Sequence, residues 1–262
     1  MERKPPLTGP GQAIFAATLV GLGLLGLHHG DFAPLWSPAP GPALLRQGLL
    51  YAGALVCLAC GTGLLWPRTA ALAARGLLAW SLLWLLLVKA PVILRRPAVE
   101  VAWQSAGETA VIVAAAWILY AGVAGSWDRK RLGPAADTTG LRLARGLYAA
   151  AMIAFGLSHW VYVKPTTALI PAVLPAHAPL AYATGAAYLA AGAAVLTGVL
   201  ARPAAALSAL QMGLFTLLVW VPLASAGHAD AGTWSELALS WTLTAAGWVV
   251  AESYSRARRA RA

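Results

Sequence analysis

Residues 51–65 read YAGALVCLACGTGLL, and 131 positions later residues 182–196 read YATGAAYLAAGAAVL. Both stretches are apolar, uncharged and rich in glycine and alanine, and their first tyrosine and one glycine fall at the same places. The pairs of identical residues at this offset include His28–His159, Pro34–Pro165, Pro40–Pro171, Tyr51–Tyr182, Gly61–Gly192, Pro91–Pro222, Trp103–Trp234 and Trp117–Trp248. Because the offset is half of the 262-residue length, the sequence predicts a tandem duplication of one structural unit.

The composition places both copies in a membrane. The chain is 60% hydrophobic and only 11% charged, with a mean hydropathy of +0.69, whereas soluble domains carry roughly 25% charged residues. A helix needs about 20 apolar residues to cross a bilayer. Eight stretches qualify, at about 12–29, 48–66, 70–94, 102–124, 143–162, 180–200, 203–223 and 234–252. The expected fold is an all-α polytopic membrane protein with eight transmembrane helices, since the alternation typical of a β-barrel is missing.

The eight helices divide into two repeats of four. The predicted boundaries are 1–126 for the first four-helix repeat, 127–140 for a basic cytoplasmic linker, 141–255 for the second repeat and 256–262 for a basic tail. An even number of crossings per unit gives both units the same orientation, so we expect parallel repeats. Each unit is expected to form a four-helix bundle with close contacts between glycine- and alanine-rich faces.

The positive charge is distributed unevenly across the membrane. With eight crossings, fourteen of the nineteen lysines and arginines lie on the side of the two termini and five on the other side. The positive-inside rule then predicts that both termini lie in the cytoplasm. The tail SRARRARA, residues 255–262, is typical of a contact with anionic lipid, so the net charge of +10 does not indicate nucleic acid. The predicted partner is the lipid bilayer.

Residues 156–196, GLSHWVYVKPTTALIPAVLPAHAPLAYATGAAYLAAGAAVL, carry a resemblance to a known family. A helix ending in Gly-x-x-His, a proline-flanked loop and a glycine-rich second helix resemble the DoxX-like family of small bacterial membrane proteins. The first half is similar, more weakly, through Gly26, His28, His29 and residues 51–65. Some relatives are membrane subunits of thiosulfate:quinone oxidoreductases or partners of redox enzymes. The resemblance therefore implies a quinone-associated role beside a soluble or membrane redox partner, although the typical member has a single unit.

Two ionisable residues within the predicted spans are candidates for function, because lipid cannot solvate them. Glu108 lies about seven residues inside its helix, hence roughly 10 Å below the membrane boundary, and Lys89 lies at similar depth on the preceding helix. One interpretation is a Lys89–Glu108 ion pair inside the bundle. The alternative has Lys89 extending to the headgroups and Glu108 protonated and hydrogen-bonded. Trp220 and Leu239 stand at the equivalent positions of the second unit, so any such site belongs to one half.

A second group of polar residues is expected near the outer face. His28, His29, Asp31, His159 and Lys164 either line a polar pocket, in which a histidine bonds to a quinone carbonyl, or only cap helix ends at the interface. Ligation of haem by His28 and His159 has no further support in the sequence. The aromatic residues expected to form a belt at this level are Trp36, Trp103, Trp160, Tyr162, Trp220 and Trp234.

The pair Cys57 and Cys60 has the C-x-x-C spacing of redox motifs. It falls in the middle of a predicted span, where a thiol ionises poorly, so packing is the preferred interpretation. The sequence shows no zinc spacing and no nucleotide-binding pattern, so no metal is predicted and quinone is the one cofactor considered.

Three functions remain open from the sequence. The first is a quinone-associated membrane subunit, which would not be an enzyme on its own because no electron-carrying group is evident. The second is a transporter or binder of a small hydrophobic molecule. The third is a non-catalytic scaffold or assembly partner.

Overall fold

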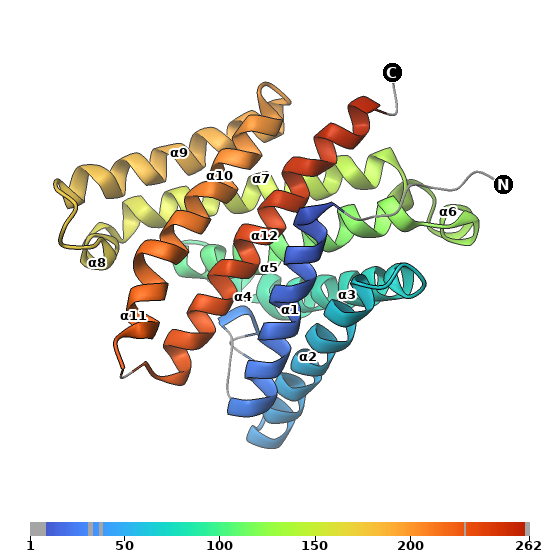
Figure 1. Ribbon diagram of the computed structural model, residues 1–262, viewed down its shortest axis with the longest axis horizontal. Coiled ribbons are helices and arrows are strands. Elements are labelled where there is room, and N and C mark those ends of the chain that lie inside the picture. Colours follow the sequence, from blue (N-terminus) through green and yellow to red (C-terminus); the bar gives the residue numbers. More distant parts are fainter. Residues whose placement is uncertain (1–8, 31–33, 37–38, 228, 260–262) are drawn as a thin grey trace.

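The structure is a computed structural model that describes residues 9–30, 34–36, 39–227 and 229–259, and helices make up almost all of this part of the chain (Figure 1). The helices of the first half are α1 (Pro10–His29), η1 (Pro34–Trp36), α2 (Ala43–Leu64), α3 (Ala70–Trp84), η2 (Leu85–Lys89), α4 (Ala90–Arg95) and α5 (Glu100–Val123). The linker forms α6 (Ser126–Leu132) and η3 (Gly133–Ala136). The second half consists of α7 (Thr138–Val161), α8 (Val163–Leu169), α9 (His177–Thr197), α10 (Ala201–Phe215), η4 (Thr216–Trp220), α11 (Val221–Ser225) and α12 (Ala231–Arg259).

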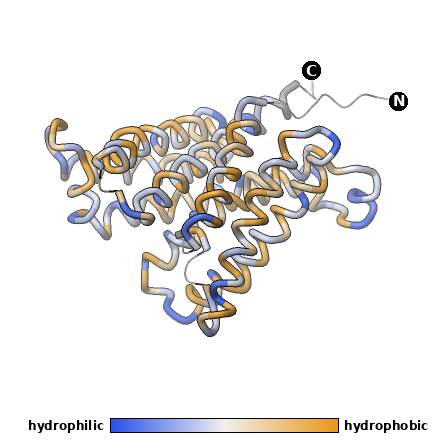
Figure 2. The backbone as a smooth tube through the Cα atoms, turned by 60° about the horizontal axis from the view of Figure 1, so that its bottom comes forward, coloured by the Kyte–Doolittle hydropathy of each residue, from blue (hydrophilic) through white to orange (hydrophobic). Residues whose placement is uncertain are grey.

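Seven helical segments are long and apolar enough to cross a membrane in the described part of the chain: Pro10–His29, Ala43–Leu64, Ala70–Arg95, Glu100–Val123, Thr138–Val161, His177–Thr197 and Ala201–Ser225. The protein therefore has the build of a multi-pass membrane protein, with hydrophobic residues along the helices and hydrophilic ones gathered at the connections (Figure 2). The eighth predicted span, 234–252, falls on α12, which is not among the seven. That crossing stays a prediction.

The helices form two rings that share a wall. The first helix ring consists of α1, α2, α3, α5 and α12, and the second helix ring of α5, α7, α9, α10 and α12, with each helix packed against the next. Helices α5 and α12 belong to both rings and pack against each other, and α12 crosses in front of α5 near the centre of Figure 1. Because protein surrounds α12 on several sides, it can carry more polar residues than a helix facing lipid.

This arrangement corrects one expectation from the sequence. The four helices of a half do not close into their own bundle, because the first helix packs against the fourth helix of the other half: α1 on α12, and α7 on α5. The physical reason is that α5 and α12 lie against each other at the centre, where each offers an apolar face to the opposite half.

The third helix of each half contains a π-helical turn in the same place. The turn η2 is followed by α4 with Pro91, and η4 is followed by α11 with Pro222. Proline lacks the N–H that a regular helix needs, and a widened turn accommodates this loss. The bounds of α3 and η2 recur 131 residues later in α10 and η4. Each π turn ends at a residue that matters below, Lys89 in the first half and Trp220 in the second.

The first two helices of each half approach closely through glycine. A Cβ at Gly61 would lie 2.8 Å from the carbonyl oxygen of Ala16, and one at Gly192 would lie 2.8 Å from that of Ala149. Such distances are too short for any side chain, so these helices touch backbone to backbone. Close approach through small residues is the usual way for helices to associate in lipid.

One end of the molecule is held by contacts between chain segments far apart in sequence. The N–H of Gly11, at the start of α1, donates to the Glu252 carboxylate near the end of α12 at 2.9 Å. Arg145, near the start of α7, donates to the Ser253 hydroxyl at 3.0 Å. The beginnings of α1 and α7 and the C-terminal part of α12 therefore lie at the same end.

The linker is anchored at this end by Asp128. Its carboxylate accepts hydrogen bonds from Arg75 at 2.8 Å, from the Tyr120 hydroxyl at 3.0 Å and from the N–H of Gly125 at 3.1 Å. Burial by itself would raise the pKa of Asp128, but these three donors and the guanidinium charge outweigh it and hold the pKa below its ordinary value. The predicted linker thus packs as part of the fold.

We expect Asp128→Asn to lower the free energy of unfolding at neutral pH by about 1–3 kcal/mol, because buried donors lose a charged acceptor. A carboxylate with a lowered pKa contributes stability above its unfolded value of about 3.9, and this contribution is lost as the pH falls through the lower native value. The difference in melting temperature between wild type and variant should therefore shrink below about pH 4. Asp137→Asn, at an exposed position, is the control. A difference that stays constant from pH 7 to pH 3 would contradict this role.

Candidate functional site

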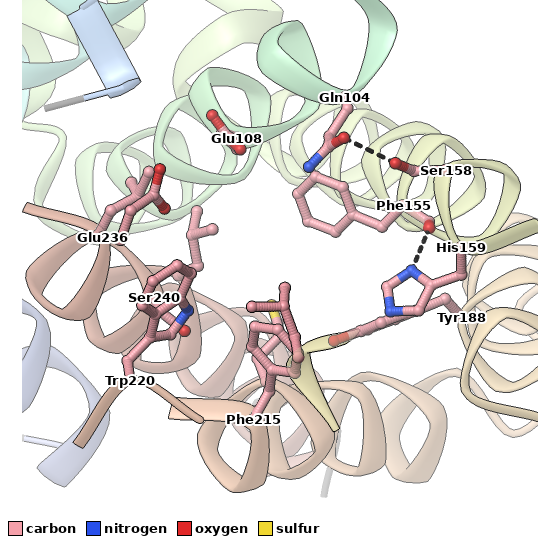
Figure 3. A pocket seen from close by; sticks show the side chains of 14 residues that line it. Gln104, Glu108, Phe155, Ser158, His159, Tyr188, Phe215, Trp220, Glu236 and Ser240 are labelled. Carbon is pink, nitrogen blue, oxygen red and sulfur yellow. Dashed lines mark hydrogen bonds between the residues drawn. The ribbon is translucent and has the colours of Figure 1, made fainter. Parts of the chain in front are cut away.

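The second helix ring encloses a cavity of about 270 Å³. Its walls come from five helices, α5, α7, α9, α10 and α12, together with η4 and one residue of α8 (Figure 3). The residues that line it are Gln104, Glu108, Phe155, Ser158, His159, Leu169, Tyr188, Met212, Phe215, Trp220, Glu236, Leu239, Ser240 and Leu243. The cavity thus draws on both halves of the chain, through α5 from the first and the other helices from the second.

Two carboxylates lie on one side of this cavity. Glu108 comes from α5 and Glu236 from α12, the two helices of the shared wall, and Figure 3 shows them next to each other across from His159. Neither carboxylate accepts a hydrogen bond from the described part of the chain, while the charge of Lys89 interacts with Glu108. Two acceptor groups of like charge in one cavity favour a ligand that brings positive charge or hydrogen-bond donors.

The opposite wall presents His159 and an amide. The Nδ1 of His159 lies 2.8 Å from the carbonyl oxygen of Phe155. Since a carbonyl only accepts, Nδ1 carries the proton, and Nε2 is left as an acceptor on a neutral ring. Gln104 accepts from the Ser158 hydroxyl at 2.6 Å through its oxygen, which leaves its NH₂ group to donate. Glu108, Glu236 and the Nε2 of His159 therefore offer acceptors to the cavity, and the amide of Gln104 offers a donor.

Aromatic rings make up much of the remaining surface. Tyr188 lies with its ring centroid 6.1 Å from that of Phe155 and 5.4 Å from that of His159. Phe215 and Trp220 lie edge to face with centroids 6.2 Å apart. The Ser240 hydroxyl is held by Thr216 at 2.6 Å, which ties α12 to the π turn beside Trp220.

Two further cavities adjoin this one. An almost wholly apolar cavity of about 290 Å³ lies between α8, α9 and α10, with Ile170, Leu180 and Leu218 in its lining. A third cavity of about 530 Å³ lies beside Gln104, Tyr162 and the start of α8. His159 lines all three, so it lies where a polar cavity meets an apolar one.

The corresponding space in the first helix ring is filled by tryptophan. Trp36, on η1, is completely buried, and its ring lies 6.0 Å from Trp80 and 5.3 Å from Trp84. Gly53 makes room for it, because a Cβ there would lie 3.1 Å from the Trp36 indole nitrogen. The segment η1 packs on both α5 and α12, and the hydroxyl of Thr109 reaches the carbonyl oxygen of Leu35 at 3.4 Å. The prediction that Trp36 belongs to an interfacial belt is therefore wrong.

The residues predicted from sequence fall in different places. Glu108 and His159 line the cavity, whereas His28, His29 and Lys164 are exposed. Those three line neither this cavity nor the two beside it, and the polar pocket at the outer face stays a prediction. Asp31 lies outside the described residues.

Lys89 is buried in the first helix ring. Its ammonium donates to the hydroxyl of Ser105 at 2.7 Å, and its side chain is 2% exposed. It therefore does not extend to the headgroups, as one interpretation had it. A direct pair with Glu108, one turn further along α5, stays a prediction.

Sequence analysis missed Glu236, Gln104 and the aromatic residues around them. The signal for Glu236 was present, since it is an ionisable residue two positions inside the eighth predicted span. The counterpart of Glu108 in the second half is Leu239, and the counterpart of Glu236 in the first half is Ser105, so matching the two halves pairs neither acid with another. Gln104 gives no signal of its own, because an amide near a helix start is common.

Cys57 and Cys60 are both free and buried in the first helix ring. Cys57 is completely buried, as expected for a cysteine that packs inside the protein. No group of three or more histidine, cysteine or acidic side chains suited to a metal ion occurs among the described residues.

Comparison with protein-family models, with curated proteins and with solved structures finds no match for this chain. The resemblance to the DoxX-like family, and the cofactor and partner it implies, stay predictions.

We expect Trp36→Ala to open a second cavity in the first helix ring. Removing a fully buried aromatic side chain costs about 3–5 kcal/mol of stability, and an apolar cavity of this kind takes up xenon or benzene. Thermal unfolding in detergent and ¹²⁹Xe NMR of the purified variant measure the two effects. Trp66→Ala, at a side chain that is 68% exposed, should change neither. A variant as stable as the wild type, or one without new xenon binding, would show that η1 does not fill the ring.

Proposed function

We propose that this integral membrane protein binds a small molecule with an apolar body in the cavity of the second helix ring, as a binder or transporter. The observation that carries the proposal is the difference between the two rings. One ring is filled by the protein's own tryptophans, whereas the other keeps a cavity with polar groups on two sides and aromatic rings between them. Sites for small molecules have this form, with mainly apolar walls and a few convergent polar groups.

The position of the cavity supports this reading. It lies where both halves of the chain meet, and ligand sites of membrane transporters typically lie at the interface between repeats. We propose that the two halves are tandem copies in the same orientation, with α12 as the eighth crossing. The recurrence of the α3 and η2 bounds in α10 and η4 supports this, as does the shared end of α1, α7 and α12.

A quinone-associated membrane subunit is the second candidate, as the DoxX-like resemblance implies. What favours it is His159 at the junction of a polar and an apolar cavity. A quinone ring would occupy the former and an isoprenoid tail the latter. With Nδ1 bound to the Phe155 carbonyl, His159 presents an acceptor to the cavity, which suits the hydroxyl of a quinol. Quinone in the lipid extract of purified protein distinguishes this candidate from the first.

Filling the cavity tests the proposal. Ser240→Phe places a ring in the cavity, and Ser240→Ala removes the same hydroxyl without filling it. Both lose the bond to Thr216, which keeps its second bond to the Met212 carbonyl oxygen at 2.9 Å. Mass spectrometry of small molecules released from protein purified in mild detergent should show at least one compound retained in wild type and Ser240→Ala. In Ser240→Phe we expect the amount of this compound to fall at least about tenfold. The phenyl ring occupies part of its site and should weaken its binding by about 1.4 kcal/mol or more. Identical extracts from all three proteins would contradict the proposal.

The proposed orientation predicts that both termini lie on one face, in the cytoplasm. Reporters fused at the C-terminus and inserted in the linker at 133–136 should both report the cytoplasm, and one inserted at 171–175 should report the outer side. The reason is the excess of basic residues on the side of the termini. A C-terminal reporter on the outer face would remove α12 as a crossing and the parallel arrangement with it.

A further inference from the structure

We infer that the cavity of the second helix ring selects organic cations: its ligand carries a positively charged nitrogen or similar head on an apolar body. This inference rests on the proposed function and adds the chemical class of the ligand.

The first step is the charge of the cavity wall. Glu108 and Glu236 both line the cavity, and Glu100 lies two turns before Glu108 on the same helix. The charge of Lys89 interacts with Glu108, but its ammonium donates to Ser105 in the first helix ring, and Lys89 does not line the cavity. In a chain with nineteen basic and nine acidic residues, two of the fourteen lining residues are acidic and none is a lysine or an arginine.

The second step is the aromatic surface that faces these carboxylates. Phe155, Tyr188, Phe215 and Trp220 all line the same cavity, and Figure 3 shows their rings around the space in front of Glu108 and Glu236. The face of an aromatic ring attracts a cation, and tryptophan and tyrosine are the strongest in this respect. Aromatic rings combined with a carboxylate are the usual means of binding quaternary ammonium groups, whereas an anion would be repelled by both.

The third step is the comparison with the first half. At the offset of 131 residues, Trp220 corresponds to Lys89 and Glu236 corresponds to Ser105. In the first helix ring the protein places its own cation at this level, and Lys89 and Ser105 are hydrogen-bonded at 2.7 Å. In the second helix ring the same two positions carry an aromatic ring and a carboxylate, with no cationic side chain in the cavity lining. The second ring is thus built to receive a cation from outside.

The hydrogen-bond acceptors of the cavity also suit a cationic ligand. The Nε2 of His159 accepts rather than donates while Nδ1 is bound to the Phe155 carbonyl. A ligand with N–H groups would find acceptors on both sides of the cavity, and one without them would still meet the carboxylates and the rings. The adjoining apolar cavity gives room for the body of the molecule.

The test uses three probes of similar shape and different charge. Benzyltrimethylammonium is the cation, 2,2-dimethylpropylbenzene its neutral isostere, and benzylsulfonate an anion with a tetrahedral head. Saturation-transfer NMR of the full chain in lipid nanodiscs measures binding, taken as the signal lost in Ser240→Phe so that partition into lipid is subtracted.

We expect benzyltrimethylammonium to bind, the neutral isostere to bind more weakly and benzylsulfonate not to bind. Glu108→Gln and Glu236→Gln should each weaken binding of the cation by about tenfold or more, because each removes a charge from a poorly solvated site. Binding of the neutral isostere should stay unchanged in both variants, which shows that the cavity is still folded. Asp137→Asn, an exposed acid in the linker region, should leave binding of all three probes unchanged.

The possible failures are distinguishable. If the cation and the anion bind equally, or if both glutamine variants bind the cation like the wild type, the cation class is overturned. If only the neutral isostere binds, the cation class is overturned while the cavity remains a binding site. If no probe shows binding that Ser240→Phe removes, and the extracts of Ser240→Phe match those of the wild type, both the cation class and the proposed function fail.

Discussion

The packing of α5 against α12 is the contact on which the rest of the structure depends. Each of these helices ends its own half and supports the first helix of the other, so α1 lies on α12 and α7 lies on α5. Neither half can bury its apolar faces alone in this arrangement. The result is two rings of five helices with a common wall, and the wall carries the polar residues because protein, not lipid, surrounds it on both sides.

The two rings differ in how their interiors are filled, and the difference arises in the connections. After α1, the segment η1 turns inward and buries Leu35 and Trp36 completely. After α7, the chain continues as α8, which packs against α7 and α9 and stays at the rim. Gly53 is part of the cause, since only a residue without a side chain leaves room for the Trp36 ring. The connection after the first helix thus decides whether a ring has a packed interior or keeps a cavity.

The two helix rings also differ in what their interiors contribute to stability. The filled ring has a tight aromatic core, and a buried aromatic side chain contributes several kcal/mol when its cavity is well packed. The second helix ring lacks this contribution and keeps the two carboxylates of Glu108 and Glu236 in its cavity, which lowers stability because burying a carboxylate is unfavourable. The closely packed glycine contacts between α1 and α2 and between α7 and α9 hold both rings in the same way.

Parts of this picture follow directly from the sequence. Apolar stretches of the right length predicted seven of the helical spans that the structure contains, and Glu108, an ionisable residue that the sequence singles out within one of them, lines the cavity. His159 was also singled out and lines the same cavity, whereas His28, His29 and Lys164, with which it was grouped, are exposed. Glu236 was missed because its counterpart, Ser105, is not acidic, so comparison of the two halves gives no sign of it.

The sequence by itself determined that the chain is helical and made for a membrane, because helix length and hydropathy are local properties that a bilayer imposes on each segment separately. Only the tertiary structure decided which helices share a ring, that Trp36 fills one of them, and that Glu108 and Glu236 meet in the other. Those outcomes depend on side-chain volume and on contacts between residues more than a hundred positions apart. Hydropathy along the chain carries no information about either.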